Sequence, residues 1–215
     1  MIGQMTKGRL EAFSDGVFAV AITLLILDVR PEGESHTGWQ MLLNDWHKIL
    51  VYLLSFVVVG VYWVAHHHMM HFIRATNRVF LWINLLLLLF IVFIPYAAAV
   101  LSASRADPSA IRIYSAVLIL TNLTSSTLWY YATKGHRLVG AALPPAFARF
   151  VLAVNTVPIL AYGLAAVLAT SYSVASLTLL ALVPAFFILP HPFIEKRILH
   201  ASVTFGGGER EQAKE

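Results

Sequence analysis

The chain has 215 residues, of which 59% are hydrophobic and only 12% are charged, and its mean hydropathy is +0.74. A soluble domain carries about 25% charged residues, so this composition excludes an ordinary soluble protein and indicates long segments buried in lipid. The chain has no cysteine, which excludes disulfides and thiolate metal sites, and its basic residues lie at the ends of apolar runs, as membrane topology requires, rather than in a patch typical of nucleic-acid binding.

Six apolar runs follow one another along the chain, at about residues 10–28, 49–65, 79–103, 111–132, 147–169 and 174–189. Each has close to the roughly 20 residues that cross a bilayer, and a segment in lipid must satisfy its own backbone groups, so we expect helices. The predicted fold is an all-α polytopic membrane protein with six transmembrane helices. Residues 1–200 form one predicted domain, and the Gly-rich, charged residues 201–215 are expected to be a disordered cytoplasmic tail.

Lysine and arginine predict the orientation. With the N-terminus in the cytoplasm, eleven basic residues fall inside: Lys7, Arg9, Arg74, Arg78, Lys134, Arg137, Arg149, Lys196, Arg197, Arg210 and Lys214. Four fall outside: Arg30, Lys48, Arg105 and Arg112. This positive-inside bias predicts a multi-pass protein of the cell membrane with both termini cytoplasmic.

The first run carries polar residues on one side. At 100° per residue, one stripe of the helix contains Arg9, Phe13, Gly16, Val20, Thr23 and Leu27. Small and polar residues on one face favour contact with protein or with a pore rather than with lipid.

Asp15 lies on another flank of this helix, and its sequence position allows two interpretations. It either pairs with a group on a neighbouring helix, as ionisable residues at membrane depth usually do, or lies at the interface, where the helix dipole favours it. Thr23 also allows two interpretations. It either has a functional role or is only structural, because a threonine in a membrane helix often bonds a carbonyl in the preceding turn.

Histidines end the second run in the sequence HHHMMH. His67 and His71 are spaced i, i+4, and His68 and His71 are spaced i, i+3, which can suit a metal ion. No third ligand lies nearby in the sequence, so we predict no metal site. Asn84, inside the third run, is predicted to form an interhelical hydrogen bond.

The segment RLEAFSD at residues 9–15 resembles the signature of the transmembrane protein 175 family, which comprises endolysosomal and bacterial potassium-permeable channels. The six runs, the histidines after the second, Asn84 and Pro31 fit the same family. The resemblance implies a homotetramer in the lipid bilayer, with the first helix of each subunit lining a central pore. It also implies potassium as the permeating ion and no further cofactor.

The resemblance further implies roles for individual residues. Val20 falls at the hydrophobic constriction, Thr23 in the potassium-selective layer, and Leu27 in an additional apolar ring. The constriction usually carries a larger side chain, so the narrowest point is either wider here or shifted to Leu24 or Leu27. Arg9, Phe13, Ser14 and Asp15 would pack the helix against its neighbours, and a histidine among His67, His68 and His71 would bond this anchor.

Other functions have less support in the sequence. No nucleophile motif or hydrolytic metal signature accompanies the acidic residues and histidines, so an enzyme is not predicted. A secondary transporter coupled to protons or ions is the alternative that remains. Six runs without inverted halves or paired broken helices argue against it.

Overall fold

The computed structural model describes residues 6–30, 37–105 and 107–188. Within these residues the chain forms seven α-helices and two 3-10 helices. The α-helices are α1 (Lys7–Leu24), α2 (Gly38–Asn44), α3 (Trp46–Phe72), α4 (Arg78–Ala103), α5 (Pro108–Thr133), α6 (Pro145–Leu168) and α7 (Ser173–Ile188), and the 3-10 helices are η1 (Leu25–Asp28) and η2 (Lys134–His136).

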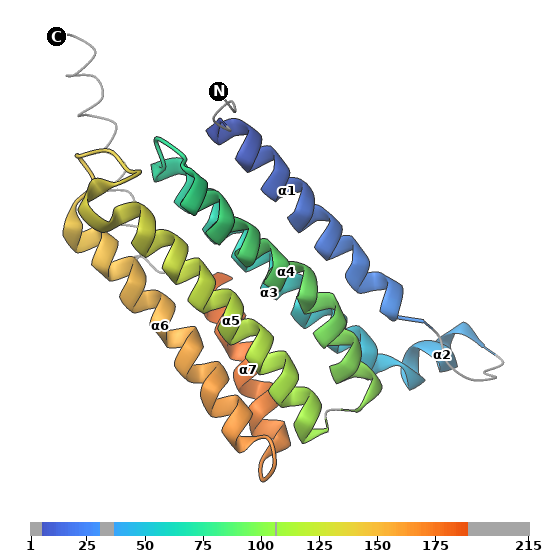
Figure 1. The fold of residues 1–215 in the computed structure, drawn as a ribbon. Coiled ribbons are helices and arrows are strands. Elements are labelled where there is room, and N and C mark those ends of the chain that lie inside the picture. Colours follow the sequence, from blue (N-terminus) through green and yellow to red (C-terminus); the bar gives the residue numbers. More distant parts are fainter. Residues whose placement is uncertain (1–5, 31–36, 106, 189–215) are drawn as a thin grey trace.

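The long helices form one bundle in which α1 occupies an edge (Figure 1). Helix α4 lies between α1 and α5, and α6 packs on α5 from the other side. Helix α7 packs against α6, α3 and α5. Helix α1 makes substantial contacts with only two of the other described α-helices, α3 and α4. The short helix α2 projects at the end of the bundle opposite the start of α1 (Figure 1). A large part of the α1 surface is therefore left uncovered by its own chain.

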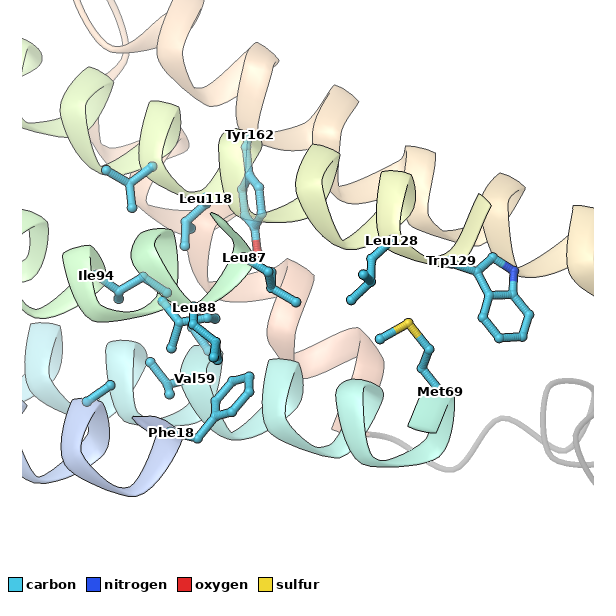
Figure 2. Packing of buried hydrophobic residues seen from close by; sticks show 14 of the residues in the cluster. Phe18, Val59, Met69, Leu87, Leu88, Ile94, Leu118, Leu128, Trp129 and Tyr162 are labelled. Carbon is cyan, nitrogen blue, oxygen red and sulfur yellow. The ribbon is translucent and has the colours of Figure 1, made fainter. Parts of the chain in front are cut away.

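The core is continuous across the bundle. Figure 2 shows Phe18 among the buried side chains where α1 meets α3 and α4, with Val59 and Leu88 in the same cluster. Tyr162 on α6 and Leu118 on α5 extend the cluster to the far side (Figure 2). Burial of such side chains stabilises the helix contacts mainly through close packing, because lipid is itself apolar.

Each of the six ranges predicted from the sequence corresponds to a helix, although α6 ends at Leu168, one residue before its predicted range does, and residue 189 lies outside the described residues. Four of the described helical segments are long and apolar enough to cross a membrane: Lys7–Asp28, Trp46–Phe72, Arg78–Ala103 and Pro145–Leu168. Helix α7 is apolar but has only 16 residues within the described part of the chain. The predicted tail at 201–215 lies outside the described residues.

Helix α5 is long but less apolar than the other long helices, since it carries several hydroxyl side chains. Thr121, Thr124 and Thr127 donate their hydroxyl protons to backbone carbonyls four residues earlier, at 2.7–2.8 Å. Asn122 donates to the Tyr62 hydroxyl at 2.9 Å. These bonds satisfy the hydroxyl and amide groups of buried Thr121, Asn122 and Thr124 and of exposed Thr127, so a helix with this composition remains compatible with apolar surroundings.

Candidate pore helix and its anchor

Helix α1 has two faces with different surroundings. The face that packs against α3 and α4 is buried and consists of Leu10, Ser14, Phe18 and Ala21, continued by Leu25 in η1. The stripe predicted from the helical wheel lies on the other face, and all of its members are exposed in the single chain: Arg9, Phe13, Gly16, Val20, Thr23 and Leu27. Val20 and Leu27 each expose 54% of their surface.

A buried hydrogen-bond network fixes the packed face. Asn84 on α4 donates from its Nδ2 to Ser14 Oγ at 3.0 Å. The Oδ1 atom of the same amide lies 2.9 Å from His66 Nε2 on α3, and since a carbonyl oxygen can only accept, His66 donates this bond. Ser14 and Asn84 are completely buried. One amide thus joins three helices at a single point.

His66 also packs on α1 directly, because its ring lies 5.5 Å from the ring of Phe18. The sequence interpretation singled out the neighbouring histidines and did not name His66. A periodicity signal was available, since Val59, His66 and Met70 recur at helical spacing and all three are buried. That spacing places His66 on the inner face of α3.

The remaining candidates occupy other positions. His67 lies beside Trp63, with ring centroids 6.0 Å apart, and contacts the ring of His68. His71 contacts Phe72 near the end of α3. Among the described residues, no group of three or more histidine, aspartate or glutamate side chains could hold a metal ion.

Asp15 is exposed and bonds to α3 through an indole rather than an imidazole. Trp63 Nε1 donates to Asp15 Oδ1 at 2.9 Å. Each of the two interpretations of Asp15 holds in part, because the residue has a partner on a neighbouring helix and also lies at the surface of the chain. The signature residues Ser14 and Asp15 therefore bond to α4 and α3, respectively.

Replacing Trp63 with phenylalanine is expected to lower the free energy of unfolding by about 1 kcal/mol, because one exposed hydrogen bond is lost while the ring is kept. Thermal melting in detergent, followed by circular dichroism, would measure the change. Trp82→Phe is a suitable control, since Trp82 is an exposed tryptophan on α4. An equal loss in both variants would remove the Asp15 bond as the cause.

Thr23 lies on the exposed face, and its hydroxyl donates to the Val20 carbonyl at 2.9 Å. Because the proton is engaged in this bond, the oxygen lone pairs remain directed away from the helix. Val20, Leu24 and Leu27 are exposed around it. The exposed Thr23 hydroxyl oxygen is thus bordered by aliphatic side chains on this face.

The far end of α1 is fastened by the start of α3. Lys48 Nζ donates to the Arg30 carbonyl at 3.1 Å and forms a salt bridge with Asp45 at 2.9 Å. The Arg30 Nε donates in turn to the Leu27 carbonyl at 3.0 Å. The pore-helix candidate is therefore held at its middle by Asn84 and at its end by Lys48.

Known proteins are similar to this chain in both sequence and fold. Residues 9–95 match the family described as endosomal/lysosomal potassium channel TMEM175. A potassium channel of Streptomyces collinus is 39% identical over 137 residues, covering 60% of this chain and 66% of that protein, slightly under two thirds of its length. A potassium channel of Chamaesiphon minutus is 35% identical over 143 residues, covering 63% of this chain and 70% of that protein.

A solved structure agrees with these matches. The crystal structure of a lysosomal potassium-selective channel TMEM175 homolog from Chamaesiphon minutus has a TM-score of 0.74 and 26% sequence identity to this chain, covering 85% of this chain and 96% of that one. The shared fold is that of an all-α polytopic membrane protein, and the family is one of ion channels, not of enzymes. The chain belongs to the TMEM175 family.

Proposed function

We propose that this chain is one subunit of a potassium-selective cation channel whose pore is lined by α1. The observation that carries the proposal is the division of α1 into a packed face and an exposed stripe that contains Val20, Thr23 and Leu27. A stripe of this kind is stable in a membrane when equivalent helices from other subunits face it across an axis. The relatives in Streptomyces and Chamaesiphon are potassium channels, which supports potassium as the ion.

A homotetramer would place four copies of each stripe residue around one axis. Four Thr23 hydroxyl oxygens could then replace part of the hydration shell of a potassium ion, since their protons are already bonded to Val20 carbonyls. Rings of Val20 and Leu27, with Leu24 beside them, would form hydrophobic constrictions that close by dewetting. Gly16 would leave the pore wide on the approach to these rings, because it has no side chain.

The signature residues belong to the same assembly. Ser14 and Asp15 bond within the subunit, whereas Arg9 and Phe13 are exposed on the lone chain. We assign Arg9 and Phe13 to packing of α1 against neighbouring helices in the oligomer. This assignment gives each part of the signature a structural role and leaves the pore surface to the residues after it.

The proposed topology has six membrane-spanning helices, with α5 and α7 added to the four segments that are long and apolar enough to cross a membrane. Helix α5 has 26 residues and lies between α4 and α6 in the bundle, so it shares their depth. The lysine and arginine count then places both termini in the cytoplasm, with the protein in the cell membrane.

Ion flux into liposomes tests the proposal. Reconstituted protein is expected to pass potassium faster than sodium, and Thr23→Ala is expected to reduce that preference by at least about fivefold, the effect of losing one hydroxyl contact worth roughly 1 kcal/mol. Thr127→Ala is a matched control, because Thr127 is an exposed threonine on α5 that also donates to its own backbone.

The outcomes separate the pore assignment from the channel assignment. Flux with an unchanged preference in Thr23→Ala would remove Thr23 from selectivity. Single-channel recording must give discrete unitary currents, and saturating flux with counterflow in their place would identify a secondary transporter instead. Cross-linking in membranes would count the subunits, and a largest product other than four copies would overturn the tetramer.

A further inference from the structure

A basic pocket of about 350 Å³ lies where α5 ends and α6 begins. Its lining includes three cationic or ionisable side chains, Lys134, His136 and Arg149, and three larger apolar or aromatic ones, Tyr130, Leu143 and Leu152. The end of α5 and the start of α6 lie at the same end of the bundle as the start of α1, with α4 between α5 and α1 (Figure 1). It is therefore separate from the proposed pore.

The turn between α5 and α6 sets the positions of these side chains. Gly135 and His136 both have positive φ angles, of 63° and 52°, which reverse the chain directly after α5. The Lys134 ammonium lies 5.3 Å from the centre of the Tyr130 ring, a cation–π contact that keeps its charge at the pocket. His136 Nε2 donates to the Leu143 carbonyl at 3.1 Å, a bond that fixes the orientation of the imidazole ring.

No described residue from α5 to α7 is a carboxylate that could neutralise the pocket. The sequence contains no aspartate or glutamate between Asp107 and Glu195. The acidic residues of the nearby start of α1 are engaged there: Glu11 is 3.9 Å from Lys7, and Asp15 accepts from Trp63. The first turns of α6 also line the pocket, and a helix N-terminus carries partial positive charge. The pocket therefore carries positive charge that the described carboxylates do not neutralise, and it favours an anion.

The position of the pocket at one end of the helices favours a membrane lipid as the source of that anion. The protein is a membrane protein, and the pocket lies where α5 ends and α6 begins. The apolar side chain of Leu152 lies about one turn further along α6 than Arg149. Basic pockets between helices at a membrane surface bind the phosphate groups of anionic lipids. We propose that this pocket binds the headgroup phosphate of an anionic phospholipid, with Lys134 and Arg149 on the phosphate and an acyl chain along Leu152.

Native mass spectrometry of the full chain tests the proposal. Protein purified in detergent is titrated with dioleoyl-phosphatidylglycerol, with dioleoyl-phosphatidylcholine as the neutral lipid. The double variant Lys134→Gln, Arg149→Gln is expected to bind phosphatidylglycerol roughly 10- to 30-fold more weakly, because two cations next to the phosphate are lost. Phosphatidylcholine binding is expected to stay unchanged.

The control removes the same charge from the same end of the bundle. Arg78 is exposed at the start of α4, and Arg137 stacks on the Tyr131 ring at 4.3 Å outside the pocket lining. The variant Arg78→Gln, Arg137→Gln is expected to bind phosphatidylglycerol as the unaltered protein does. Equal losses in both double variants would mean general attraction to the basic end and would overturn the pocket, as would no loss in either. If millimolar glycerol 1-phosphate displaced the lipid, the ligand of the pocket would be a soluble phosphate ester, and the lipid proposal would be overturned. The readout is lipid retention, so the result is independent of ion conduction.

Discussion

Replacing Asn84 with leucine is expected to lower the free energy of unfolding by about 1–3 kcal/mol. The substitution leaves Ser14 Oγ and His66 Nε2 buried without the partner that joins them, and an unsatisfied buried polar group costs more than its lost bond alone. Thermal unfolding in detergent would measure the loss. Because the amide also holds α1 against α3 and α4, potassium flux is expected to fall with stability.

A double-mutant cycle distinguishes the network from simple loss of packing. If Asn84 and Ser14 act as one bonded unit, adding Ser14→Ala to Asn84→Leu should cost less than Ser14→Ala does in the unaltered chain, since the hydroxyl has already lost its partner. Additive costs would contradict the network as the source of stability. Leu89→Ala provides a reference for an exposed change on the same helix.

A cationic thiol reagent is expected to reduce potassium current through a Leu27→Cys variant by at least about tenfold, because a ring of fixed positive charges would repel potassium in a narrow pore. The natural chain contains no cysteine, so the reagent has one target per subunit. The charge is added after assembly, which separates block of the pore from a folding defect. Whole-membrane or single-channel recording before and after the reagent gives the measurement.

Ile26 provides a matched control for Leu27. The two residues are adjacent in η1 and similarly exposed, at 48% and 54%, but they point in different directions around the helix axis. The Ile26→Cys current is expected to persist after the reagent, and a reductant should restore the Leu27→Cys current. Equal block of both variants, or block of Ile26→Cys alone, would contradict the proposed orientation of α1.

The sequence was sufficient to place a helix in each of the six apolar runs, because such runs leave the backbone few alternatives in lipid, and four of these helices are long and apolar enough to cross a membrane. It did not reveal α2, whose seven residues at Gly38–Asn44 are too few for a periodic signal. It also did not reveal that the end of the first run tightens into a 3-10 helix at Leu25–Asp28. The end of η1 is tied to α3 by the bond from Lys48 to the Arg30 carbonyl, a contact between distant residues that the sequence does not reveal.

The anchor of α1 could be predicted only in part. Asn84 was expected to bond between helices, and the structure places it between Ser14 and His66. The choice of His66 over its neighbours depends on the rotation of α3 about its axis, which three consecutive histidines leave open. The Trp63 bond to Asp15 could not be anticipated, since an indole gives no pairing signal in sequence. The roles of Val20 and Thr23 in permeation remain predictions.

The division of α1 into two faces has a consequence for protein engineering. The residues that hold the helix within its own subunit, such as Ser14 and Phe18, do not overlap with those of the exposed stripe, such as Val20 and Thr23. Substitutions away from packed sites usually change stability by less than about 0.5 kcal/mol. Libraries that randomise the stripe alone should therefore yield mostly folded subunits, so that conduction can be redesigned on a constant scaffold.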